Sequence, residues 1–152
     1  MSMIAARTAQ AGLAARIFTS LKAHLDPLLA GKILTEAIQS DAMAAGQAFA
    51  RQAPEGPNLK HFATVLERWR EDNALVIEDV ELSDDTLNFV VTNCAYARVY
   101  AEMSLEPELG FILSCARDEP FAHGYSPCLD MQRSETIMQG RPCCRFTFTW
   151  RK

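Results

Sequence analysis

Apolar residues recur at helical spacing through the first half of the chain. One stripe recurs every fourth residue: Leu13, Ile17, Leu21 and Leu25. This spacing predicts one apolar face of an amphipathic helix. Asp26 is suited to be the N-cap of a second helix that begins at Pro27 and runs through an alanine-rich segment to Ala53. Gly46 within it is either a weak point or a site of close packing.

A third helix is expected beyond the breaker Pro54-Glu55-Gly56-Pro57. Asn58 can cap it. Its buried face would consist of Leu59, Phe62, Leu66 and Trp69.

From Ala74 onward, apolar residues alternate with polar ones, which indicates strands. The turn Ser83-Asp84-Asp85 separates two such segments, so we predict an antiparallel hairpin. Helices are expected over 95–103 and from Pro107 toward Cys115, followed by a loop over 118–127.

A second hairpin is predicted from strands over 129–138 and 144–150, which turn at Gln139 and Gly140. Its last strand would direct four side chains to one face: Cys144, Phe146, Phe148 and Trp150. We therefore predict an α+β fold in which N-terminal helices pack on an antiparallel sheet of about four strands, built from two hairpins separated by helices. A length of 152 residues fits a single domain over 1–152.

Charge and hydropathy argue against two kinds of partner, nucleic acid and membrane. The formal net charge of -4 argues against nonspecific nucleic-acid binding, which needs a clustered positive field. The longest uncharged run, 86–97, is about a dozen residues and falls short of the roughly 18 needed to span a bilayer. Five cysteines, an odd number, and an N-terminus without the pattern of a secretion signal favour free thiols in a reducing cytoplasm.

Reactive side chains are concentrated between Cys115 and Phe146. Cys115 and Asp118 are one helical turn apart if the helix persists, so they can share a face. His123 has the intrinsic pKa of a general acid or base, and Arg133 can grip a carboxylate through two parallel hydrogen bonds. These residues can surround one pocket.

Each of these residues also has a purely structural interpretation. Cys115 can be a small core residue, and Asp118 can pair with Arg117 or cap a backbone N–H. His123 can be an idle surface residue, and Arg133 can pair with Glu135. One set of residues has side chains soft enough to bind zinc: Cys94, Cys115, His123 and Cys144. The set lacks the CxxC pair of a zinc finger, so we expect no metal and no other cofactor.

The ordered set of these motifs resembles the L-2-amino-thiazoline-4-carboxylate hydrolase family. Its elements in chain order are Cys94, Cys115 with Asp118, His123-Gly124-Tyr125 with Pro127, Arg133, the run Thr136-Ile137-Met138-Gln139-Gly140, and Cys144 with Phe146. The resemblance covers roughly the C-terminal half. The chain departs from the family pattern at Arg145, where the family usually has an acidic residue, and it adds Cys128 and Cys143.

The resemblance implies a hydrolase that opens a cyclic amidine or thiazoline carboxylate with water. Cys115, Asp118 and His123 would then be catalytic, either through a covalent thiol intermediate or through direct attack by water. Arg133 would clamp the carboxylate of a small-molecule substrate. Cys94, Cys144 and Tyr125 would line the same site.

A rival hypothesis is a noncatalytic module that binds a small molecule or a metal. The order of hairpins and helices is similar to that of the vinyl-reductase-type ligand-binding domains, although a shared fold does not establish a function. The apolar helix surface exceeds what a small sheet can cover, which favours a homodimer.

Overall fold

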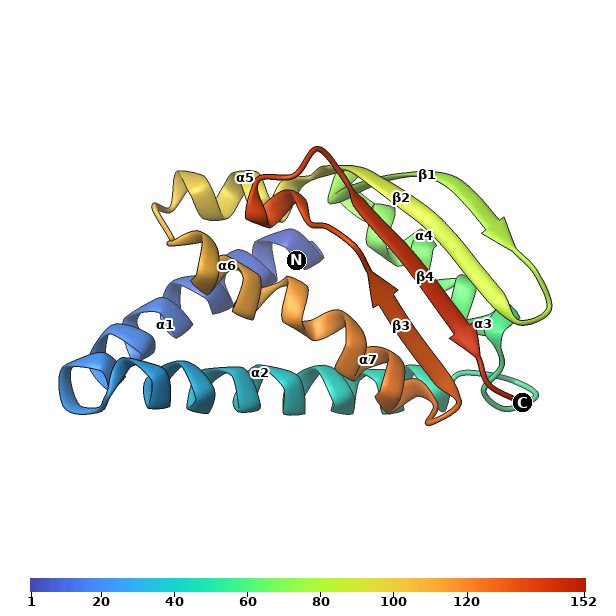
Figure 1. The fold of residues 1–152 in the computed structure, drawn as a ribbon, viewed down its shortest axis with the longest axis horizontal. Helices are drawn as coiled ribbons and strands as arrows, with labels where there is room; N and C mark the ends of the chain where they lie inside the picture. The colour runs from blue at the N-terminus through green and yellow to red at the C-terminus, as the bar shows by residue number, and fades with distance from the viewer.

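The computed structural model describes residues 1–152, and two long helices form its base (Figure 1). Helix α1 spans Met3–His24, and α2 spans Pro27–Ala50. The predicted cap of α2 is confirmed, because the Asp26 carboxylate accepts hydrogen bonds from the backbone N–H groups of Leu28 and Leu29 at 3.0 and 3.3 Å. The helix ends at Ala50 rather than Ala53.

The apolar stripe predicted on α1 does not all face the interior. Leu13 and Ile17 are exposed, and Ala11 is the buried residue of this helix. Small residues allow α1 to approach its neighbours closely, and Phe18 packs beside them against the buried cluster, while Leu13 and Ile17 lie outside that contact.

The single helix predicted after Asn58 is two short helices, α3 (Leu59–Ala63) and α4 (Val65–Arg70). Asn58 caps the first, since its side-chain oxygen accepts the His61 N–H at 2.9 Å. The break lies at Thr64, whose N–H and hydroxyl both donate to the His61 carbonyl oxygen, at 3.0 and 2.7 Å. This i to i−3 bonding tightens the chain and interrupts the α-helical ladder. A 3₁₀ turn, η1 (Glu71–Asn73), follows.

The four strands form one antiparallel sheet in the order β1-β2-β4-β3. Their bounds are β1 (Leu75–Leu82), β2 (Thr86–Cys94), β3 (Leu129–Arg133) and β4 (Cys144–Trp150). Between the two hairpins lie α5 (Ala95–Glu102), α6 (Pro107–Leu113), the 3₁₀ turn η2 (Cys115–Arg117) and α7 (Asp118–Tyr125). The predicted α+β fold is confirmed.

Two predicted segments were wrong. The expected loop over 118–127 is largely helix α7, in which Pro120 lies in the first turn, where a proline costs no helical hydrogen bond. The third strand ends at Arg133 and does not reach Met138. The 3₁₀ turn η3 (Ile137–Gln139) follows it instead, capped by the Thr136 hydroxyl, which accepts the Gln139 N–H at 3.2 Å.

Helix α7 lies along the second half of α2 (Figure 1). Two glycines permit this approach. A Cβ atom added to Gly46 would collide with the backbone carbonyl of Phe121, and one added to Gly124 would collide with the carbonyl of Met43. The close-packing interpretation of Gly46 is therefore confirmed.

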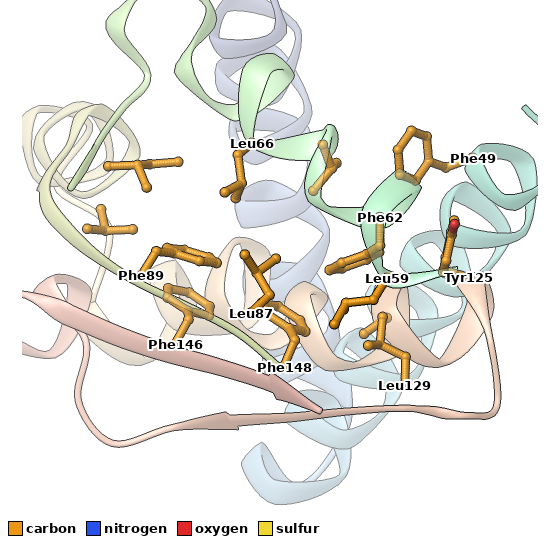
Figure 2. Packing of buried hydrophobic residues seen from close by; sticks show 14 of the residues in the cluster. Phe49, Leu59, Phe62, Leu66, Leu87, Phe89, Tyr125, Leu129, Phe146 and Phe148 are labelled. Atoms are coloured by element: carbon orange, nitrogen blue, oxygen red, sulfur yellow. The ribbon is translucent and has the colours of Figure 1, made fainter. Parts of the chain in front are cut away.

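The main core lies on one face of the sheet, covered by α3, α4, α7 and the end of α2. Phe89 stacks on Phe146 with ring centroids 4.8 Å apart, and Phe62 of α3 packs against Phe148 with ring centroids 4.9 Å apart. These side chains lie together in Figure 2. A second, smaller cluster joins α1, α2, α5 and α6: Ala11, Leu34, Tyr100, Leu109 and Leu113.

Candidate functional site

A cavity of about 340 Å³ lies between the two hydrophobic clusters. Phe49, Val91 and Phe146 line it from the main cluster, and Tyr100 and Leu113 line it from the smaller one. This volume suits a small organic molecule.

Five of the seven predicted site residues line this cavity: Cys94, Cys115, Asp118, Arg133 and Cys144. The fold brings them together through the ends of its elements. Cys94 is the last residue of β2, Cys144 the first of β4 and Arg133 the last of β3. Cys115 and Asp118 lie where α6 passes through η2 into α7.

Arg133 holds the polar part of the cavity together. Its Nη1 donates to the Cys115 carbonyl oxygen at 3.1 Å and also to the Asp118 carboxylate. Its guanidinium lies over the rings of Phe111 and Phe146, 5.5 and 5.4 Å from their centroids. A cation held by an ion pair, a carbonyl and two aromatic faces has a fixed position.

Burial controls the protonation of this group of residues. It raises the pKa of Asp118 to about 6, and the positive charges of Arg133 and Arg117 oppose that rise. The Asp118 side chain keeps 25% of its surface accessible, and Asp118 lines the cavity. Asp118 is therefore a carboxylate that can gain or lose a proton near neutral pH.

The three cavity thiols are protonated at neutral pH. Burial raises the pKa of Cys94 and Cys115, and it raises that of Cys144 to about 11. The negative charge of Asp118 adds to the rise at Cys115. A thiolate nucleophile would have to be generated by a base during the reaction.

His123 and Tyr125 do not line the cavity. Because residues 118–125 form a helix and not a loop, His123, five positions after Asp118, projects from a different face. Its Nε2 lies 3.9 Å from the Asp130 carboxylate, in solvent. Tyr125 is two turns beyond Asp118, about 10 Å along the axis. Its hydroxyl accepts the Asn58 N–H at 3.1 Å, which is a structural contact in the main core.

The positions of these side chains do not form a cluster of metal ligands. No group of three or more histidine, cysteine, aspartate and glutamate side chains lies close enough together to hold a metal ion. The cavity brings the cysteines of the candidate zinc set to one place without His123.

Several polar side chains that line the cavity were not predicted as site residues, among them Arg7, Arg68, Tyr96 and Tyr100. Arg117 was expected only as a possible partner of Asp118, whereas it pairs with Asp41 of α2. The charged residues that line the cavity are four arginines, Arg7, Arg68, Arg117 and Arg133, and a single carboxylate, Asp118. A protein of net negative charge thus has a cavity with an excess of positive charge, which favours an anionic occupant.

No helix of the protein combines the length and the apolar character needed to cross a membrane.

Comparison with known proteins confirms the family resemblance. Residues 6–148 match the model of the L-2-amino-thiazoline-4-carboxylic acid hydrolase family, so the chain belongs to that family. A comparison with curated proteins found no match.

One similar solved structure is the crystal structure of the phenol-responsive sensory domain of the transcription activator PoxR with phenol. It is 12% identical with a TM-score of 0.56, and the match covers 92% of this chain and 73% of that one. At this identity the likeness shows a shared fold.

Proposed function

We propose that this member of the family is a hydrolase that opens the ring of a cyclic amidine carboxylate such as 2-amino-thiazoline-4-carboxylate. The observation that carries the proposal is the grouping of Cys115, Asp118 and Arg133 in one cavity, where burial raises the pKa of Asp118 to about 6. A carboxylate with this pKa can take up and return a proton at neutral pH.

In the reaction, the oxygen of a water molecule bonds to the amidine carbon of the ring as the carbon–nitrogen π bond opens and its electron pair moves to the ring nitrogen. Asp118 accepts the proton that this water gives up and passes it to the ring nitrogen. The carbon–sulfur bond then breaks and its electron pair stays on sulfur. Asp118 takes the remaining hydroxyl proton as the carbonyl forms and gives it to that sulfur. The product carries a urea group and a free thiol, and the atoms of one water molecule have been added.

Arg133 keeps Asp118 ionised until water attacks, and it fixes the direction of the carboxylate. Cys115 places its thiol beside the same carboxylate and positions the water. Because the raised pKa of Cys115 disfavours a resting thiolate, direct attack by water is favoured over a covalent thiol intermediate.

The test is turnover of 2-amino-thiazoline-4-carboxylate by the purified protein. Asp118→Asn should abolish turnover, Cys115→Ser should reduce it strongly, and both variants should remain folded. Cys128→Ser is the matched control, since Cys128 lies outside the cavity and its loss should leave the rate unchanged. Absence of turnover across a panel of cyclic amidine carboxylates would refute the proposal.

A noncatalytic binding module is the second candidate. Most residues that line the cavity are apolar, and the fold is shared with a domain solved with phenol. Native mass spectrometry separates the two candidates, because a sensor would retain its ligand unchanged while a hydrolase would release product.

Two finer features belong to the same proposal. Five free cysteines favour a cytoplasmic location. Exposed apolar residues on α1 and α2, among them Leu13, Ile17 and Leu28, favour a homodimer, which sedimentation analysis would detect.

A further inference from the structure

We infer that Arg7 and Arg117 form the subsite that binds the carboxylate of the ligand, whereas Arg133 remains paired with Asp118. The inference rests on the proposed function for the identity of the substrate, and it extends to any small carboxylate that enters the cavity. It assigns the acid group to the wall formed by α1 and η2.

The two guanidinium groups come together from elements far apart in the chain. Arg7 is on α1, Arg117 is in η2, and both line the cavity. Both approach the same oxygen, Oδ2 of Asp41 on α2. Arg117 forms an ion pair with it, and Nη1 of Arg7 lies 3.9 Å away. Arg7 also donates to the Gln10 side chain at 3.1 Å.

The Asp41 carboxylate is therefore the shared counter-ion of two arginines, Arg7 and Arg117. The Asp41 side chain is 66% exposed, so water screens much of its charge, whereas those of Arg7 and Arg117 are only 27% and 11% exposed. Burial and the nearby charge of Arg117 lower the pKa of Arg7, which reflects this crowding. A carboxylate of the ligand, placed between the two guanidinium groups, would reduce the repulsion between their positive charges.

The other two cavity arginines make contacts apart from Asp41. Arg133 is bound by the Asp118 carboxylate and the Cys115 carbonyl. Arg68 donates to the Gln52 side chain, and its guanidinium lies over the Phe49 ring, 4.9 Å from the centroid. Arg68 has no carboxylate partner, but it is exposed and water screens its charge. The surplus of positive charge that is shielded from water therefore lies at Arg7 and Arg117.

Asp118 lies within the electrostatic reach of both arginines, since each lowers its pKa. A short ligand can therefore place its acid group at Arg7 and Arg117 and its ring at Asp118. This arrangement orients the ring without occupying the arginine that keeps Asp118 ionised.

The test uses two ring compounds that resist hydrolysis, 2-aminothiazole-4-carboxylate and 2-aminothiazole, with binding measured by calorimetry. The wild-type protein should bind the carboxylate more tightly. Arg7→Gln and Arg117→Gln should each weaken its binding by about 10- to 100-fold, because each removes a hydrogen-bonded charge contact. Binding of 2-aminothiazole should change little in either variant.

Arg68→Gln is the matched control, because it removes an exposed cavity arginine that lies outside the shared contact with Asp41. It should leave the preference for the carboxylate intact. Arg117→Lys should retain part of the preference, since it keeps the charge but loses the paired donors. Melting temperatures of all variants verify that the protein is folded.

Equal binding of the two compounds by wild-type protein would overturn the inference. A preference that survives both Arg7→Gln and Arg117→Gln would overturn it as well. Turnover measurements keep this test separate from the proposed function. A protein that prefers the carboxylate through these arginines but turns over no substrate retains the subsite and loses the reaction.

Discussion

Replacing Arg133 with glutamine should raise the pKa of Asp118 further. Burial already raises that pKa from the ordinary 3.8 to about 6, and Arg133 is the largest influence that opposes burial. An adjacent arginine typically lowers the pKa of an aspartate by about 1 to 3 units. The titration midpoint of Asp118 should therefore move upward by about that amount in Arg133→Gln, and Asp118 would be mainly neutral at neutral pH.

The same change has a consequence for stability. A carboxyl with a raised pKa binds its proton in the folded protein at pH values where the unfolded chain has released it. Its contribution to stability is complete below the ordinary pKa of 3.8 and is lost as the pH rises through the folded value of about 6. The shift of roughly two units corresponds to about 3 kcal/mol. In Arg133→Gln, this loss should continue to higher pH.

An NMR titration of the Asp118 carboxyl carbon measures the midpoint, with Asp118→Asn to assign the signal. Urea unfolding at a series of pH values measures the loss of stability. Arg133→Lys is the control, because it keeps a positive charge and should hold the midpoint closer to that of the wild type. An unchanged midpoint in Arg133→Gln would refute the view that this ion pair controls Asp118.

Three further outcomes are expected. Gly46→Ala should lower the free energy of unfolding in urea by about 1 to 3 kcal/mol or more, because the added methyl group meets backbone. Gly31 lies on the same helix with open space around a Cβ atom, so Gly31→Ala should raise the free energy of unfolding by up to about 1 kcal/mol. Equal changes in the two variants would contradict the close contact at Gly46. His123→Ala should leave turnover unchanged, and a large loss of rate would return His123 to the mechanism. Iodoacetamide should label Cys115 far more slowly in the folded protein than in urea, as peptide mass spectrometry would show, since burial raises the pKa of Cys115; equal rates would count against it.

Local signals in the sequence predicted much of the fold. The alternation of Phe146 and Phe148 with Arg145 and Thr147 defined β4 and its buried face, because strand side chains alternate between two surfaces. Asp26 and Asn58 marked helix starts, since capping depends on neighbouring residues alone. Three candidate residues that lie at the ends of strands accordingly line the cavity: Cys94, Arg133 and Cys144.

Features that depend on distant contacts could not be predicted in this way. Pro120 and Gly124 favoured a loop, but Gly124 is required where α7 meets the backbone of α2, and that partner is invisible in the local pattern. The prediction that His123 faces the cavity rested on the same expected loop, and in the helix its side chain points elsewhere. Arg7 is more than a hundred residues from Arg117 in the chain, and only tertiary packing brings the pair to one wall.

The position of the cavity between two hydrophobic clusters gives its occupant a structural role. A molecule held there would touch the interiors of both halves of the protein and would be lost when either half opened. Its binding would therefore favour the folded chain by mass action, by about 2.7 kcal/mol at a ligand concentration 100 times the Kd. In a cell that degrades unfolded chains, the amount of this protein would rise and fall with the supply of its ligand.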